Sequence, residues 1–301
     1  MSTTERATVT ASENPMILRE RLRDRLKKAR EQAGLTQRQV ANAFGWSPSK
    51  VIRIENGRIG VSVTDAMALV SQYGIEGDEA RELVDLAKAA RQPSWFAPYR
   101  PVISSAFEAF LAYEESAKIV RAYEPNITPG LLQTEEYARA VLQSFPQGGE
   151  GPDGSNLELR VDLRMKRQKI LQSEDAEFFF ILDECALHRR VGNETIMRQQ
   201  HEALLRINDM PNVTILYVPF TVGVYPLYTG PCHIFESANA DDDLVVFLEN
   251  PDGDTILNEK SPRTGKGKDP GDYLDEFWQV ERELAKPITR SSLPYGGPGS
   301  E

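Results

Sequence analysis

Apolar residues recur with the period of an α-helix near the start of the chain. The recurring positions, three or four residues apart, are Leu18, Leu22, Leu26 and Ala29. This spacing predicts an amphipathic helix that begins near Pro15. Gly34 is expected to end it, because glycine readily adopts the left-handed conformation that often follows a helix. The polar residues 1–14 before it predict a disordered arm.

Two short helices are predicted next, each with its own capping residue. Thr36 is placed to cap the first, and Gln39 three positions later completes a capping box. Gly45 interrupts the pattern, and Ser47 then caps a further helix. Pro48 suits the first position of that helix, because its φ is preset and its missing N–H would have no partner there.

The last of these helices sorts its residues into an inner and an outer face. At 100° per residue, Val51 and Ile54 fall on one side and define the face toward the core. The residues that fall on the other side are Ser49, Ile52, Arg53 and Asn56. A short helix that offers a hydroxyl, a guanidinium and an amide fits the major groove of DNA. The alternative is an ordinary pair of amphipathic helices in an all-α protein.

Two further helices, over residues 64–73 and 78–90, complete an all-α domain that we place at residues 15–92. The next segment, RQPSWFAPYRP, holds three prolines and cannot sustain a helix. We therefore assign residues 93–105 to a linker.

The remaining sequence mixes helical and strand patterns. Residues 102–125 predict an amphipathic helix with Phe107, Phe110, Leu111 and Ala117 on its apolar face. Further helices are predicted within residues 134–145, 156–172, 193–209 and 272–285. Segments with the β-branched and aromatic content of strands are residues 177–187, 213–220, 232–237 and 243–250. These patterns predict an α+β domain with a small sheet over residues 106–287 and a disordered tail over residues 288–301.

The net charge of -10 is unevenly distributed along the chain. Residues 1–60 hold 12 Lys and Arg against 6 Asp and Glu, a balance of +6, so the remainder carries -16. A basic module favours polyanions, whereas an acidic one is repelled by a phosphate backbone. The first domain is therefore the expected binder of nucleic acid, and the second is better suited to proteins or small molecules.

The sequence predicts neither a membrane segment nor a disulfide framework. No apolar run reaches the roughly 18 residues of a membrane span, and the N-terminus lacks an apolar signal segment. We expect a cytoplasmic protein that associates with the nucleoid when it is bound to DNA. The two cysteines, Cys185 and Cys232, are too few for a disulfide framework, and neither lies in a CxxC spacing.

The helices on either side of Gly45 resemble the helix-turn-helix of the Cro/cI (XRE) class of repressors. The resemblance covers residues 15–75 and rests on the capped helices, on TQ at 36–37 and on IENG at 54–57. Pro48 departs from this class, because relatives often place a base-reading glutamine at that position. The base sequence of the operator therefore cannot be inferred from the operators of relatives.

The resemblance also implies roles for individual residues. The residues expected to read bases are Ser49, Lys50, Ile52 and Arg53. The residues expected to hold the DNA backbone are Thr36, Gln37, Asn56 and Arg58. An ion pair between Arg30 and Glu55 is implied to lock the first helix onto the third.

The second domain resembles the C-terminal domain of actinobacterial XRE regulators related to WhiJ, which are antitoxin-like transcription factors. The resemblance covers residues 106–277 and rests on YEPNITPGLLQTEEYARAVL, LDECALHRRVGNETIMRQQHEALL and MPNVTILYVPFTVGVYPLYTGPCHIFE. It implies regulation of developmental or secondary-metabolic genes, often with a small partner protein encoded nearby. The loop at 146–155 and the basic loop SPRTGKGKDPG fit that family less well.

A catalytic or metal site is the competing interpretation of the second domain. Asp183, Glu184, Cys185 and His188 are close in sequence, and the last two have the i,i+3 spacing of a metal pair. The chain has only three histidines, however, and no third ligand is spaced nearby. NPDGDT at 250–255 lacks the distal carboxylate of a calcium loop and predicts a hairpin turn. We therefore expect no enzymatic activity, no metal and no cofactor.

Two functions remain open. The first is a sequence-specific transcriptional regulator, a repressor, that binds a double-stranded operator and whose C-terminal domain binds a partner protein or ligand. The second is an antitoxin-like protein that neutralises a small partner protein and uses DNA binding for autoregulation.

A single helix-turn-helix reads few base pairs, so we expect a homodimer joined by the second domain. Tyr225 and Tyr228 are the candidate partner or ligand surface, unless these tyrosines merely cover the sheet.

Overall fold

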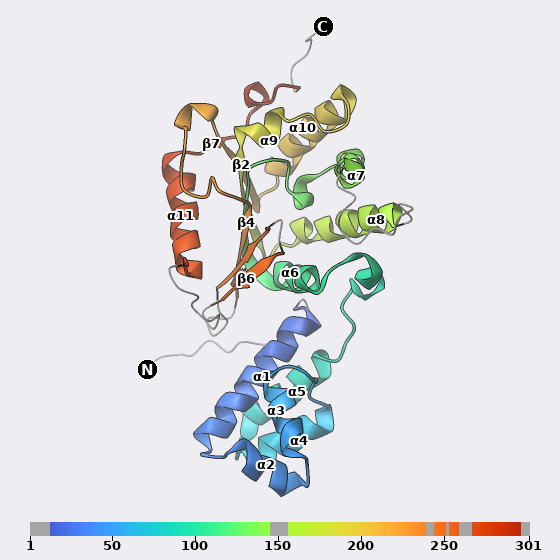
Figure 1. Ribbon diagram of the computed structural model, residues 1–301, viewed down its shortest axis with the longest axis vertical. Helices are drawn as coiled ribbons and strands as arrows, with labels where there is room; N and C mark the ends of the chain where they lie inside the picture. Colours follow the sequence, from blue (N-terminus) through green and yellow to red (C-terminus); the bar gives the residue numbers. More distant parts are fainter. Residues whose placement is uncertain (1–12, 145–155, 239–243, 251–252, 259–266, 296–301) are drawn as a thin grey trace. The chain divides into compact units, whose positions relative to one another are not determined.

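The computed structural model describes residues 13–144, 156–238, 244–250, 253–258 and 267–295 (Figure 1). The chain divides into two compact units, residues 1–97 and 98–301. The division falls within the proline-rich segment at 91–101. Within the described ranges, no helix is long and apolar enough to cross a membrane.

The first unit is built from helices alone. They are α1 (Pro15–Gln32), α2 (Gln37–Phe44), α3 (Pro48–Glu55), α4 (Val63–Gln72) and α5 (Gly77–Ala89). Their apolar faces share one core, in which Leu22, Val40, Ala41 and Leu86 are almost completely buried. The all-helical class expected for this part of the chain is confirmed.

Caps and turns fix the limits of the short helices α2 and α3. Thr36 accepts a hydrogen bond from the N–H of Gln39, whose side-chain oxygen accepts one from the N–H of Thr36, so the predicted capping box is present. Gly45 has a φ of +64°, a conformation that costs glycine little. Ser47 occupies the N-cap position of α3, but its hydroxyl contacts that of Ser49 rather than the helix backbone.

A mixed sheet of seven strands forms the centre of the second unit (Figure 1). The strands are β1 (Ala117–Glu124), β2 (Glu177–Asp183), β3 (Val213–Val218), β4 (Cys232–Ser237), β5 (Val245–Leu248), β6 (Thr255–Leu257) and β7 (Lys286–Pro287). Their order across the sheet is β6-β5-β4-β1-β2-β3-β7. β1, β2 and β3 run parallel, and all other neighbouring pairs are antiparallel.

Helices cover both faces of this sheet (Figure 1). The α-helices are α6 (Ser105–Ser116), α7 (Glu135–Ser144), α8 (Leu157–Arg167), α9 (Glu184–His188), α10 (Glu194–Asn208) and α11 (Pro270–Glu283). Short 3-10 helices occupy Ala97–Val102, Gly130–Leu132, Gln168–Gln172, Phe220–Val222 and Arg290–Ser292. On one face, Phe277 of α11 packs in a cluster with Tyr123 and Ile234 of the sheet. On the other face, Phe110 of α6 packs edge-on against Phe235 of β4.

The structure corrects the prediction at the centre of the sheet. Residues 102–125 do not form one helix, because α6 ends at Ser116 and Ala117 begins β1. The β-branched Ile119 and Val120 favour extended backbone, and pairing with β2 and β4 on either side commits the segment to the sheet. The predicted α+β class is confirmed, although β1, β6 and β7 make the sheet larger than expected.

Residues at both ends of the described chain are packed more closely than predicted. Asn14, expected in a disordered arm, caps α1 by accepting a hydrogen bond from the N–H of Met16. Residues 288–295, expected in a disordered tail, include the buried side chains of Ile288 and Leu293. Several segments that the sequence singled out lie wholly or partly outside the described residues: most of that arm, the loop at 146–155, and parts of the turn at 250–255, of the basic loop at 261–271 and of the tail.

Candidate functional site

The helix α3 presents a mixed polar and apolar face to solvent. Val51 and Ile54 are 2% and 4% exposed and anchor the helix in the core. The exposed side chains on its outer face are Ser49, Ile52, Arg53 and Asn56. This division follows the helical period, and it leaves a hydroxyl, a guanidinium and an amide available to hydrogen-bond with base edges. The exposed Ile52 adds an apolar surface that can contact a thymine methyl group.

A buried ion pair holds α3 against α1. Nε of Arg30 lies 2.5 Å from Oε1 of Glu55, and Nη2 lies 3.0 Å from Oε2. Hydrogen bonding to Glu55 raises the pKa of Arg30, so the guanidinium stays charged. Nη1 of Arg30 also donates to the carbonyl oxygen of Leu35 at 2.7 Å. The pairing implied by the resemblance is therefore present, and it connects α1, α3 and the turn before α2.

The residues expected to hold the DNA backbone lie at the two ends of the α2–α3 segment. Thr36 caps α2, and Gln37 is the first residue of that helix. Nε2 of Gln37 donates to Oε2 of Glu55 at 2.7 Å, which places it next to the buried ion pair. Asn56 and Arg58 follow α3 and are exposed. These positions are compatible with phosphate contacts on both sides of α3.

Lys50 is held within the first unit. Its Nζ lies 3.0 Å from Oδ1 of Asp65 in α4 and 3.6 Å from the centre of the Trp46 ring. Its side chain is mostly buried, so Lys50 helps pack α3 against α4 and does not share the exposed face. In the free protein the ammonium of Lys50 therefore faces Asp65, and the expectation that Lys50 reads bases stays a prediction. Arg38, which was not among the residues predicted to contact DNA, is exposed in the first turn of α2, next to Gln37.

The two tyrosines proposed as a partner surface differ in exposure. Tyr225 is 7% exposed, and its hydroxyl lies 2.7 Å from that of Tyr123 and 2.6 Å from Oδ2 of Asp183. Tyr225 therefore belongs to the core beside the sheet, which corrects its assignment to a surface. Tyr228 is exposed, as is the neighbouring Val224.

The sequence cluster at Cys185 and His188 falls in and around α9. Asp183 caps this helix by accepting a hydrogen bond from the N–H of Cys185. Nε2 of His188 lies 3.4 Å from Glu184, and Arg189 donates to Sγ of Cys185 at 3.2 Å. Within the described ranges, no third metal-ligating side chain joins this pair.

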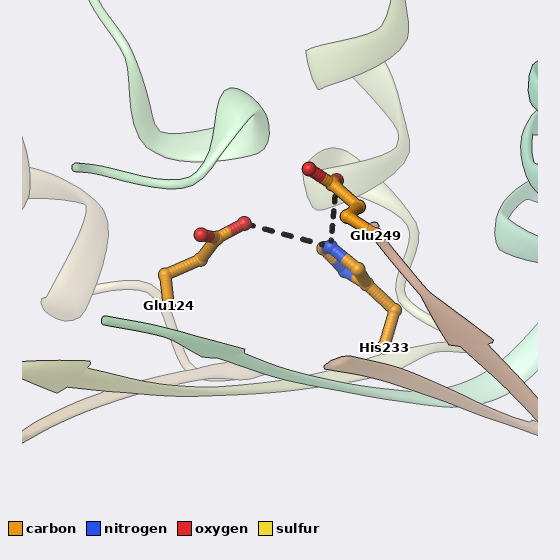
Figure 2. Close-up of side chains that lie close together, drawn as sticks. All are labelled: Glu124, His233 and Glu249. Carbon is orange, nitrogen blue, oxygen red and sulfur yellow. Dashed lines mark ion pairs between the residues drawn. The ribbon is translucent and has the colours of Figure 1, made fainter. Parts of the chain in front are cut away.

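A different cluster, which no sequence motif indicated, lies over the sheet. It consists of Glu124, His233 and Glu249 (Figure 2). Glu124 is the last residue of β1, His233 lies in β4, and Glu249 directly follows β5. Nε2 of His233 lies 3.5 Å from Oε1 of Glu124 and 3.5 Å from Oε1 of Glu249. The phenyl ring of Phe110 packs edge-on against the imidazole, which places the cluster on the α6 side of the sheet.

The register of three strands explains why these side chains meet. His233 lies opposite Ala122 in β1 and opposite Phe247 in β5. Each glutamate is two residues further along its strand and therefore points to the same face as a diagonal neighbour of the histidine. No local pattern indicated this cluster, because the prediction placed Glu124 in a helix and could not supply strand pairing.

Burial and charge act against each other in this cluster. Burial would lower the pKa of His233, but the two carboxylates raise it to about 9. Burial raises the pKa of Glu124. The buried Nε2 of His233 has no hydrogen-bond partner among the described residues. Its distance of 3.5 Å from each carboxylate exceeds the roughly 2.7–3.2 Å that is usual for an N–H···O bond.

Two family models match the chain. One, described as a helix-turn-helix domain, matches residues 21–83, and the other, described as a domain of unknown function (DUF5753), matches residues 107–264. No curated protein and no solved structure matches it. The first match indicates DNA binding by the unit that contains α3. The second covers more than half of the chain but assigns no activity to the unit that contains the sheet.

Proposed function

The chain belongs to the DUF5753 domain family, and from this membership together with its helix-turn-helix domain we propose that it is a sequence-specific transcriptional regulator. In this proposal the first unit reads an operator in double-stranded DNA, and the second unit joins two copies and binds a partner protein or ligand. The protein acts as a repressor and carries out no catalysis. Repression needs only that the bound protein exclude polymerase from a promoter, so it is a simpler mechanism than activation.

The exposed face of α3 carries this proposal. Ser49 and Arg53 lie one helical turn apart on that face, and both are exposed. The major groove admits a single α-helix, and a guanidinium can donate two hydrogen bonds to guanine. Because Val51 and Ile54 hold α3 from behind, its outer side chains can reach base edges without repacking the core.

Contacts to phosphate would set the register of α3 in the groove. Thr36 and Gln37 lie at the N-terminus of α2, where the helix dipole favours an anion. Arg58, beyond the end of α3, and Arg38 add exposed cations. Such contacts position a protein without reading sequence, so specificity is left to Ser49 and Arg53.

The charge distribution supports a division of labour between the two units. The first unit holds 15 Lys and Arg against 12 Asp and Glu, a balance of +3, and the second unit holds 20 against 33, a balance of -13. The acidic unit is repelled by phosphate and is therefore better suited to hold two DNA-binding units together. Two copies would bind half-sites about one helical turn, roughly 34–36 Å, apart.

The proposal is tested by selecting bound sequences from a random double-stranded library with the full chain. We expect a repeated or palindromic operator that is bound about a thousandfold or more tightly than random DNA at physiological salt. The same operator, cloned upstream of a reporter gene, should cause repression of that gene when the protein is expressed. Equal affinity for all sequences would exclude a sequence-specific regulator.

A further inference from the structure

The cluster of Glu124, His233 and Glu249 has the arrangement of metal ligands (Figure 2). Each residue offers one ligand atom, and the three atoms lie within 4.8 Å of one another. They converge from three neighbouring strands on one face of the sheet. We propose that this cluster binds a divalent transition-metal ion, with Zn²⁺ as the best fit. This inference does not depend on DNA binding by the first unit.

The distances match a tetrahedral metal better than they match hydrogen bonds. Zinc bonds to imidazole nitrogen and carboxylate oxygen measure about 2.0–2.2 Å, so two ligands at a tetrahedral angle stand roughly 3.3–3.6 Å apart. Both distances from Nε2 of His233, to Glu124 and to Glu249, are 3.5 Å. The two glutamate oxygens lie within 4.8 Å of each other, so they would have to approach each other only where that separation exceeds the tetrahedral distance.

The imidazole nitrogen gives an independent indication. His233 is 4% exposed, and its Nε2 is buried between the two carboxylates without a hydrogen-bond partner among the described residues. An N–H group donates along one direction and cannot serve both glutamates well. A cation has no such preference and would contact all three groups.

The donor set selects the kind of ion. Imidazole nitrogen suits zinc and related transition metals, whereas Ca²⁺ and Mg²⁺ prefer oxygen ligands. Three protein ligands leave the fourth position of a tetrahedral ion open to water or a small anion. The side chain of Glu249 is 48% exposed, which provides a path from solvent to the site.

Two nearby arginines have partners of their own. Arg167 makes two hydrogen bonds with Glu114, and Arg164 donates to Oε1 of Gln133 at 2.8 Å. Both carry positive charge close to the cluster, and Arg164 attracts the carboxylates of Glu124 and Glu249. This charge weakens the binding of a cation and favours an anionic ligand in the open position. The two glutamates supply the charge that neutralises a divalent ion.

The test uses the untagged full chain, freed of metal with a chelator and then dialysed into chelator-free buffer. Metal content after dialysis against Zn²⁺ and calorimetric titration should both show one ion per chain. Binding should raise the unfolding midpoint of the second unit, because a ligand that binds only the folded state stabilises it. Substitution by Co²⁺ should give the visible absorption of a four-coordinate site, and Mg²⁺ or Ca²⁺ should leave the midpoint unchanged.

Matched substitutions locate the ion. Glu249→Gln keeps the side-chain shape at a half-exposed position, and His233→Gln removes the nitrogen ligand. Both are expected to weaken zinc binding about tenfold or more. Glu177→Gln, at an exposed position of β2, and His188→Gln, at the exposed pair in α9, serve as controls and should leave affinity unchanged.

Several results would overturn the proposal. Wild-type protein that retains no stoichiometric zinc after dialysis would show that the cluster is only an internal ion-pair network. Zinc affinity unchanged by Glu249→Gln in a folded protein would lead to the same conclusion. Loss of binding in His188→Gln alone would place the ion at α9.

Discussion

Among single residues, Arg53 has the chemistry best suited to read a base. Its guanidinium is exposed on α3, and its one hydrogen bond to the part of the chain that the structure describes is a 3.4 Å contact with the carbonyl oxygen of Ser49. Arg53→Ala is expected to cost about 1–3 kcal/mol of binding free energy on the selected operator, because it removes hydrogen bonds to a base. Binding to random DNA should barely change. Fluorescence anisotropy with both DNAs at one salt concentration measures the difference.

Two comparison variants separate reading of bases from holding of phosphate. Gln37→Ala should weaken binding to operator and to random DNA alike, because phosphate contacts carry no sequence information. Arg81→Ala removes an exposed arginine on α5, outside the α2–α3 segment, and should change neither affinity. If Arg53→Ala instead lost the same free energy on both DNAs, Arg53 would belong with the phosphate contacts.

His201 makes the stability of the second unit depend on pH. Its Nε2 pairs with the carbonyl oxygen of Leu187, and its Nδ1 accepts a hydrogen bond from the N–H of Tyr295, so the folded protein holds the neutral ring. Burial lowers the pKa of His201 to about 4, below its usual 6.5. The stability it contributes is present above pH 6.5 and is lost as pH falls toward 4. We expect a loss of about 2 kcal/mol between pH 7 and pH 5, measured by denaturant unfolding.

The variant His201→Gln tests whether His201 causes this pH dependence of stability. A glutamine amide can donate to Leu187 and accept from Tyr295, but it does not titrate. Its unfolding free energy should therefore change less between pH 7 and pH 5 than that of the wild type. An identical pH dependence in both proteins would assign the effect to other groups.

At the scale of elements, the ion pair of Arg30 and Glu55 sets how α1 and α3 pack. Both side chains are almost buried, so removal of one leaves the other charge without its partner. Arg30→Met or Glu55→Met alone should destabilise the first unit by roughly 3 kcal/mol or more, and the double change should cost less than either single one. A double-mutant cycle of unfolding free energies measures this coupling. Additive effects would show that the two residues act independently.

The elements also differ in how far local sequence predicts them. The helices α2 and α3 were predictable because their caps, their glycine turn and their apolar spacing all lie within about twenty residues. The strand β1 was not predictable in this way. Phe107, Phe110 and Leu111 of α6 have helical spacing, and this pattern does not show that the helix ends at Ser116. Ile119 and Val120 favour extended backbone, but the hydrogen bonds from β2 and β4, which are distant in sequence, commit residues 117–124 to a strand.

At the scale of the whole molecule, the proposed homodimer depends on the second unit. The first unit uses its exposed α3 face for DNA, and the acidic second unit is free of that task in our proposal. Sedimentation or light scattering should therefore show a homodimer for the full chain and a monomer for a fragment that ends at Ala97. A monomeric full chain that still binds a palindromic operator tightly would show that DNA itself brings two copies together.

The sequence alone determined the first unit and the general class of the second. Caps, turns and helical spacing act between residues close in the chain, so they identified α2, α3 and the outward face of Arg53. The tertiary structure alone decided the burial of Tyr225, the pairing of Lys50 with Asp65, and the meeting of Glu124 with His233. Each of these depends on contacts between segments that are distant in sequence, and a local pattern carries no information about which segments pair.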